Sequence, residues 1–278
     1  MGKEQVMSEQ ELMTEYVKEV AKEVYQDAGK PIAKPTGELV GLIPRAIKAA
    51  LLPIEKWIVD REYNLAETKK LLEQRLANIS PEQIEAPEAH IAVPAFQYIS
   101  YCMDNEELRN MYANLLASSM NKAVKDGVHP SFVEIIKQLC PDEAKILKHF
   151  YKKVSIPVIT LKRKNNKENF QIVIELFSTI GFSSGCEAPL DYINYFNNLM
   201  RLGLIEKGEH GAGYSDTTVY DELIKHNVVK KQVDEIISAA EFNIPDYDMG
   251  YIRLTPFGNS FCKICLDELS NQNNTPIE

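Results

Sequence analysis

The clearest chemical spacing in this sequence is a pair of cysteines, Cys262 and Cys265, separated by two residues. Two thiolates at this spacing can hold zinc, but a structural site needs four ligands, and no second pair or neighbouring histidine supplies the others. A redox role requires a thioredoxin-like setting of strands and helix, which the surrounding residues do not form. We therefore expect the pair to lie in a final helix with no metal and no cofactor.

The histidines give no catalytic arrangement either. His129 precedes a Pro-Ser step that starts a helix, and no nucleophile with a carboxylate orienter accompanies it. We expect His129 to shape that turn. The chain has neither an HExxH motif nor a Gly-rich phosphate-binding loop of a common type. The sequence therefore predicts a protein that is not an enzyme and has no small-molecule substrate.

Basic and amide side chains define an alternative, nucleic-acid-binding hypothesis. One group lies at the tip of a predicted β-hairpin and the other on a predicted helix over residues 190–202. The candidates are Lys162, Arg163, Lys164 and Lys167 on the hairpin, and Asn197, Asn198 and Arg201 on the helix. The net charge of −9 and the pI near 5.2 argue against a general nucleic-acid coat. Protein–protein contact is therefore the favoured use of this part of the chain.

Residues 39–59 form the most hydrophobic stretch and predict an amphipathic helix. Its apolar stripe with a neighbouring Trp consists of Ile43, Ile47, Leu51, Ile54, Trp57 and Ile58. Burial in the core or against a partner is the favoured interpretation, because a chain of this size must bury its most apolar helix. Basic residues beside the stripe leave insertion into a membrane surface as an alternative. No stretch reaches the ~18 uninterrupted apolar residues of a membrane span.

Three helices in succession are predicted between residues 104 and 150. The first covers residues 106–125, with Asp104 as its N-cap and a stop at Asp126-Gly127. The second opens at Pro130, and Pro141 starts the third. The expected buried positions are Leu108, Met111, Tyr112, Leu115, Leu116, Met120, Ala123, Phe132, Ile135, Ile136, Leu139, Ile146, Leu147 and Phe150.

The C-terminal half changes to a period of two. Strands are predicted over residues 156–163 and 170–177, then the helix over 190–202 ending at Gly203. Short strands at residues 204–205 and 251–254 flank a long excursion that contains a helix near residues 219–240. Pro256 opens the last helix. This order predicts a winged-helix-like module with an enlarged wing.

The expected fold class is mainly α (α+β), with N-terminal helices, a central helical bundle and a C-terminal winged-helix-like module with a small antiparallel sheet. Further helices are expected over residues 8–27, 60–78 and 94–103. The predicted domains are residues 1–84, 85–150 and 151–270, followed by a disordered polar tail over 271–278. Five cysteines, an odd number, and an N-terminus without a signal-peptide core predict a cytoplasmic protein.

Three segments are similar to one protein family. They are ELRNMYANLLASSMNKAVKDGVHPSFVEIIKQLCPDEAKIL, NNLMRLGLIEK and IRLTPFGNSFCKICL, which occur in the expected order within residues 85–266. They resemble the Abi-alpha family of bacterial proteins, which is associated with abortive infection by phage. One departure is Cys140, where a serine is expected to cap the following helix.

The resemblance implies an antiviral defence role and transfers no catalytic residues. We expect a non-enzymatic sensor or effector that works through a protein partner or self-association. The alternatives are a winged-helix DNA-binding regulator and a membrane-active toxin that uses residues 39–59.

Overall fold

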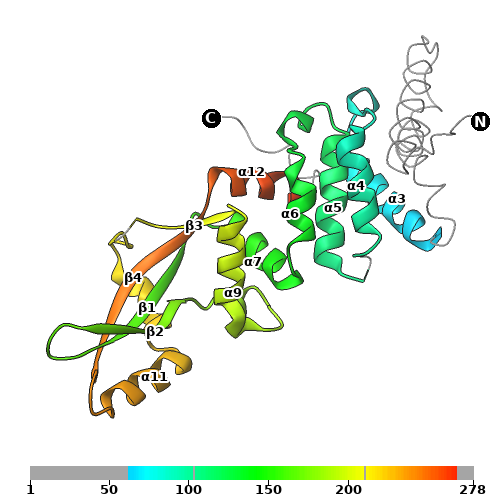
Figure 1. Cartoon of the computed structure of the whole chain (residues 1–278). Coiled ribbons are helices and arrows are strands. Elements are labelled where there is room, and N and C mark those ends of the chain that lie inside the picture. The colour runs from blue at the N-terminus through cyan, green and yellow to red at the C-terminus, as the bar shows by residue number, and fades with distance from the viewer. Residues whose placement is uncertain (1–61, 103, 210, 268–278) are drawn as a thin grey trace, which may run out of the picture. The chain divides into compact units, whose positions relative to one another are not determined.

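The computed structural model describes residues 62–102, 104–209 and 211–267. This part of the chain is mixed α+β and mainly helical, with one small antiparallel sheet, as the sequence predicts (Figure 1). It divides into two compact units. Unit 1 comprises residues up to Gln138 together with those from Ile264 onward, and unit 2 runs from Leu139 to Lys263. The predicted boundary at residue 150 differs from this division, which assigns the third central helix to unit 2.

Unit 1 is helical. Its elements are α3 (Glu62–Leu76), η1 (Pro81–Gln83), α4 (Ala89–Ile99), α5 (Glu106–Ser119), η2 (Lys125–Gly127) and α6 (Ser131–Lys137). Helix α4 begins five residues before the predicted start at Pro94, which lies inside it. Pro94 lacks a backbone N–H and so removes one hydrogen bond from inside α4. Burial of the inward face of α4, which includes Phe96 and Ile99, stabilises the helix despite this loss.

Among the described elements of unit 1, helix α5 is the most buried. Leu108, Met111 and the other apolar residues through Met120 lie inward as predicted. Two details of the prediction were wrong. The N-cap is Asn105, whose side chain accepts a hydrogen bond from the Leu108 N–H at 2.9 Å. The helix also ends at Ser119, which leaves Ala123 exposed, because Asn121 enters a β-bridge with Ile84.

Polar side chains of α5 bind the end of the last helix, α12 (Pro256–Cys265). Buried Asn114 donates to the Cys265 carbonyl at 3.0 Å, and buried Ser118 donates to the Ile264 carbonyl at 3.3 Å. The last carbonyls of a helix have no partner within it. Side chains of α5 therefore satisfy the C-terminus of α12.

Unit 2 contains the sheet and the helices around it. Its elements are α7 (Pro141–Tyr151), β1 (Ile156–Lys164), β2 (Phe170–Phe177), α8 (Ile180–Ser183), η3 (Pro189–Asp191), α9 (Tyr192–Arg201), β3 (Ile205–Lys207), η4 (Thr217–Tyr220), α10 (Asp221–Ile224), α11 (Asn227–Ile237), β4 (Ile244–Leu254) and most of α12. The strand order is β2-β1-β4-β3, and every neighbouring pair is antiparallel. Large apolar side chains, including Phe150, Phe177 and Phe196, are fully buried in this unit.

Strand β4 is much longer than the predicted strand at residues 251–254. It begins at Ile244 and pairs with β1 along the whole of that strand (Figure 1). Pro245, Asp246 and Asp248 are residue types depleted in strands, so the sequence pattern hid this extension. The predicted helix near residues 219–240 is likewise broken into η4, α10 and α11, with His226 as the N-cap of α11.

Candidate interaction surface on the β1–β2 hairpin

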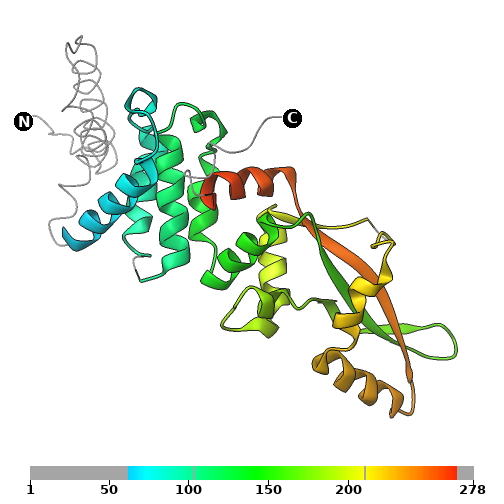
Figure 2. The same cartoon turned by 180° about the vertical axis from the view of Figure 1, so that it is seen from behind.

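The hairpin formed by β1 and β2 holds most of the predicted nucleic-acid-binding residues. Its turn is closed by Asn165, whose backbone N–H donates to the Asn169 carbonyl at 3.1 Å. The Asn165 side chain also accepts from the N–H groups of Lys167 and Asn169, both at 3.0 Å. Glu168 adopts a positive φ of 61°, as expected for the last position of a three-residue hairpin loop. The turn projects beyond the helices of unit 2 (Figure 2).

Two of the four basic candidates form ion pairs with acidic side chains of β4. The Lys162 ammonium lies 2.5 Å from Asp248 and 3.4 Å from Asp246. Lys164 lies 3.0 Å from Asp246 and 3.7 Å from Glu168. The hydrogen bond to Asp248 raises the pKa of Lys162, and the one to Asp246 raises the pKa of Lys164. The charges of both lysines are therefore compensated mainly by acids of the neighbouring strand β4.

The other two basic candidates lie nearer the solvent. Arg163 is on β1 and donates to the Gln171 side chain at 2.9 Å. Lys167 is exposed in the turn. The hairpin thus brings the four predicted residues together, and its outward positive charge is smaller than the sequence suggests.

Apolar side chains line the same face of the hairpin as the paired lysines. In the strand register, Phe170, Lys164 and Ile244 form one row across β2, β1 and β4. The next row on that face is Ile172, Lys162 and Asp246. Phe170, Ile172 and Ile244 are 56%, 55% and 42% exposed. We call these residues, with Asp248, the hairpin surface.

Helix α9 does not present its predicted residues as one surface. Asn197 is exposed, whereas Asn198 donates to both carboxylate oxygens of Glu143, at 2.9 and 3.0 Å. Arg201 in turn donates to the Asn198 side-chain oxygen at 2.7 and 3.1 Å. Asn198 is therefore engaged within unit 2, at the start of α7.

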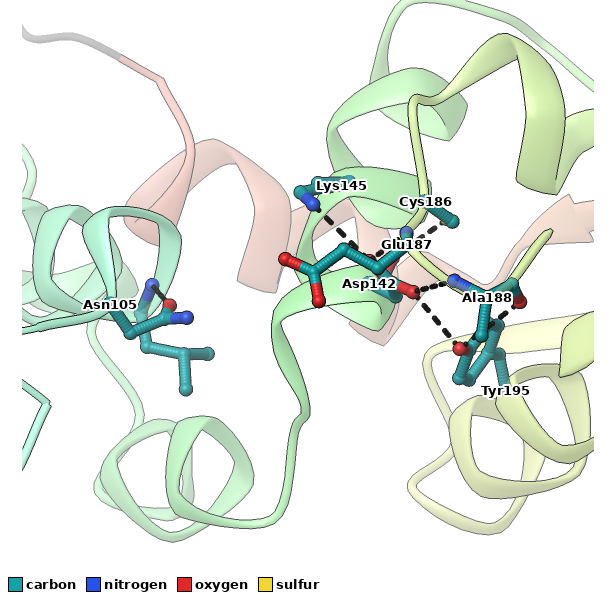
Figure 3. A network of polar contacts seen from close by, with 8 residues as sticks. Asn105, Asp142, Lys145, Cys186, Glu187, Ala188 and Tyr195 are labelled. Carbon is teal, nitrogen blue, oxygen red and sulfur yellow. Dashed lines mark hydrogen bonds and ion pairs between the residues drawn. The ribbon is translucent and has the colours of Figure 1, made fainter.

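A second carboxylate at the start of α7, Asp142, is also buried and fully bonded (Figure 3). Its donors are the N–H of Glu187 (3.0 Å), the N–H of Ala188 (3.1 Å), the hydroxyl of Tyr195 (3.0 Å) and the ammonium of Lys145 (3.2 Å). Glu143 also accepts the N–H of the N-cap residue Cys140 at 2.8 Å, which closes a capping box. These two acids fix the loop before α9, and α9 itself, onto α7.

The electrostatics of Asp142 follow from these bonds. Burial by itself raises the pKa of the Asp142 carboxyl, but the four hydrogen bonds favour its charged form and outweigh burial. The pKa therefore lies below the ordinary value of 3.8. Burial, and then the bond to Asp142, raises the pKa of the Tyr195 hydroxyl, which remains a donor.

The remaining sequence candidates are placed as follows. Cys262 and Cys265 lie in α12, both buried, and burial raises the pKa of the Cys262 thiol. His129 precedes α6, and its Nδ1 accepts the Ser131 N–H at 3.2 Å. Within the residues that the structure describes, His, Cys, Asp and Glu side chains nowhere gather in threes able to hold a metal ion.

The predicted membrane or partner helix lies outside the described residues. Its candidates are Ile43, Ile47, Leu51, Ile54, Trp57 and Ile58. Among the described helices, none combines the length and apolar character needed to cross a bilayer.

The sequence prediction missed five contributors to the hairpin surface. Ile244, Asp246 and Asp248 occur in a stretch assigned to the wing. Phe170 and Ile172 were assigned to a strand without regard to their exposure. The alternation of Ile244, Asp246 and Asp248 opposite Lys164 and Lys162 is a pattern that could have indicated a strand with cross-strand ion pairs.

Comparisons with known proteins identify one family. The family model described as abortive infection alpha matches residues 60–265. A solved structure of an uncharacterized protein from the marine bacterium Alcanivorax borkumensis SK2 is 16% identical and covers 52% of this chain and 96% of its own, with a TM-score of 0.35. The search of curated proteins gave no match.

Proposed function

Because the chain belongs to the abortive infection alpha family, we propose that it defends bacteria against phage, as a non-enzymatic sensor or effector that works through protein contacts. The family match over residues 60–265 carries the defence role. The exposed apolar side chains of the hairpin surface support the contact mode, since clustered exposed apolar groups mark interaction sites. We place the protein in the cytoplasm, where its cysteines remain reduced.

Deletion of the gene from its native strain tests the defence role. We expect phage to plate with higher efficiency on the deletion strain, and expression of the wild-type chain to restore protection. Unchanged plating across a broad phage panel contradicts the defence role.

Variants of the hairpin surface test the contact mode in the same assay. Phe170→Glu/Ile172→Glu should fail to restore protection, because it replaces the exposed apolar groups on β2. Ile237→Glu is the matched control, because Ile237 is 59% exposed and belongs to α11, outside the strands that form the hairpin surface. Equal protection by both variants, at equal protein levels, argues against contacts through the hairpin.

A DNA-binding regulator is the second candidate, supported by topology. Unit 2 runs helix α7, strand β1, helices α8 and α9, strand β3 and strand β4, with β1, β4 and β3 adjacent. A winged helix has this order of elements, with β2 and the α10–α11 insertion as additions here. The paired lysines count against tight phosphate binding, because β4 acids compensate them.

Fluorescence anisotropy of labelled random duplex DNA across salt concentrations distinguishes the two candidates. The protein-contact proposal predicts no binding at low salt. Binding that weakens steeply as salt rises shows phosphate contacts and favours the regulator.

A further inference from the structure

We propose that the open edge of β2 pairs antiparallel with the same edge of a second copy of this chain, about a twofold axis. Strand β2 is an edge strand of the sheet, and within the described residues no strand lies outside it. The inference deepens the proposed function, on which it rests for its biological purpose, by naming the partner that the hairpin contacts.

The hydrogen-bond pattern of the hairpin makes two residues of β2 available for pairing. The Asn165–Asn169 bond defines a hydrogen-bonded pair, so alternation along the ladder makes Arg163 and Gln171 the next such pair. The backbone N–H and C=O groups of Phe170 and Ile172 consequently point away from β1. An unpaired edge of this kind is a template for another strand.

A bulge fixes how long the paired segment can be. Lys162 pairs with Ile172, but Leu161 pairs with Ile174, so Val173 is an extra residue on β2. The regular part of the edge therefore ends at Ile172. A partner strand therefore needs to pair only with residues 170–172.

Residues 170–172 of a second copy can pair with the same residues of the first. With Gln171 on the twofold axis, Phe170 lies opposite Ile172 of the second copy, and Ile172 lies opposite its Phe170. Pairs of an aromatic with a β-branched residue stabilise antiparallel sheets. Both residues are more than half exposed in the single chain, and this pairing covers them.

Charge does not oppose a second copy at this edge. Lys162 and Lys164, beside the edge, are compensated by Asp246 and Asp248 of the same chain, so the two copies do not repel each other there. Glu175, beyond the bulge, is likewise compensated within its own chain, by Lys207 at 3.1 Å.

A cysteine on the axis tests this geometry in the full-length chain. Gln171 and its copy form a non-hydrogen-bonded pair, whose Cα atoms lie about 4.5 Å apart in such ladders, a separation that a disulfide spans. Under mild oxidation, Gln171→Cys should form a disulfide-linked dimer at least ~10-fold faster than Ile237→Cys, whose exposed position on α11 reports random collision. The wild-type chain, with five cysteines of its own, gives the background. Equal rates for the two variants overturn the proposal.

Sedimentation of the uncrosslinked protein provides the second measurement. The wild-type chain should sediment as a dimer at high concentration, and Phe170→Glu/Ile172→Glu should be monomeric. In the single chain the new acids lie beside Lys164 and Lys162, which favours the folded monomer. In the dimer each new acid would lie opposite an acid of the second copy, and the two would repel each other. Ile237→Glu should dimerise like the wild type. A wild-type chain that stays monomeric at all concentrations, or a dimer that the edge variant does not disrupt, overturns the proposal. Phage plating on the deletion strain tests the defence role separately.

Discussion

Asn198 shows how a residue type suited to reading DNA can serve the fold. Its amide nitrogen donates to both carboxylate oxygens of Glu143, a buried acid that would otherwise lack these donors. Both Asn197 and Asn198 were candidates from the sequence. In the structure Asn197 is exposed, whereas Asn198 is bonded to Glu143.

Substituting these two neighbours gives a matched comparison. Asn198→Asp should lower the free energy of unfolding by about 2–3 kcal/mol, because it replaces a donor with a negative charge against the buried Glu143. Asn197→Asp is exposed and should change it by less than ~0.5 kcal/mol. Urea unfolding at neutral pH measures both, and equal effects would contradict the structural role of Asn198.

The hydrogen-bonded carboxyl of Asp142 predicts a pH dependence of stability. Its pKa in the folded chain lies below the unfolded value, so its contribution is complete above about pH 4–5 and is lost as pH falls through the folded pKa. Asp142→Asn should lower the free energy of unfolding by about 2–3 kcal/mol at pH 7, because an amide cannot accept all four hydrogen bonds.

Unfolding curves of both proteins from pH 7 to about pH 2.5 check this expectation. The wild-type chain should lose more stability over the acid range than Asp142→Asn, so that the two curves converge. Parallel curves would show that Asp142 does not titrate differently on folding.

At the scale of elements, sequence periodicity predicted those parts whose burial depends on local spacing. Helix α7 and strand β2 lie within a residue or two of their predicted bounds, helix α6 begins one residue after Pro130, and the inward face of α5 is correct through Met120. The first half of β4 was missed, because Asp246 and Asp248 are stabilised there by lysines more than 80 residues earlier in the chain. The site depends on the same long-range pairing, so the sequence indicated its lysines and not the acids that compensate them.

The start of α12 depends on a close approach that only glycine permits. A Cβ atom at Gly258 would lie 1.9 Å from the backbone oxygen of Leu204. Gly258→Ala should therefore force the helix away from this backbone and lower the free energy of unfolding by about 2–3 kcal/mol. At Gly250 the nearest atom to an added Cβ is 3.8 Å away, so Gly250→Ala should cost far less. Thermal unfolding compares the two, and similar melting temperatures would rule out the steric argument.

At the scale of the whole molecule, two distant parts of the chain build unit 1. Ile264 and Cys265, at the end of α12, are buried in that unit and accept hydrogen bonds from Ser118 and Asn114. The core around α5 is therefore incomplete without residues that follow all of unit 2 in the sequence.

A pair of truncations tests this dependence. Ending the chain after Lys263 should destabilise unit 1 by about 3 kcal/mol or more, because two buried side chains and two hydrogen-bond acceptors are lost. Ending it after Asp267 keeps both residues and should therefore destabilise unit 1 less than ending it after Lys263. Hydrogen exchange of the α5 amides reads the effect directly, and unchanged protection in the shorter chain would contradict it.

The same arrangement sets an order of events during synthesis on the ribosome. Residues 139–263 are all translated before Ile264 and Cys265. Unit 2 can therefore finish folding while unit 1 still lacks these two residues of its core. Asn114 and Ser118, made early, stay without these acceptors until translation is nearly over. The part of the protein that is synthesised first is thus the last to become complete.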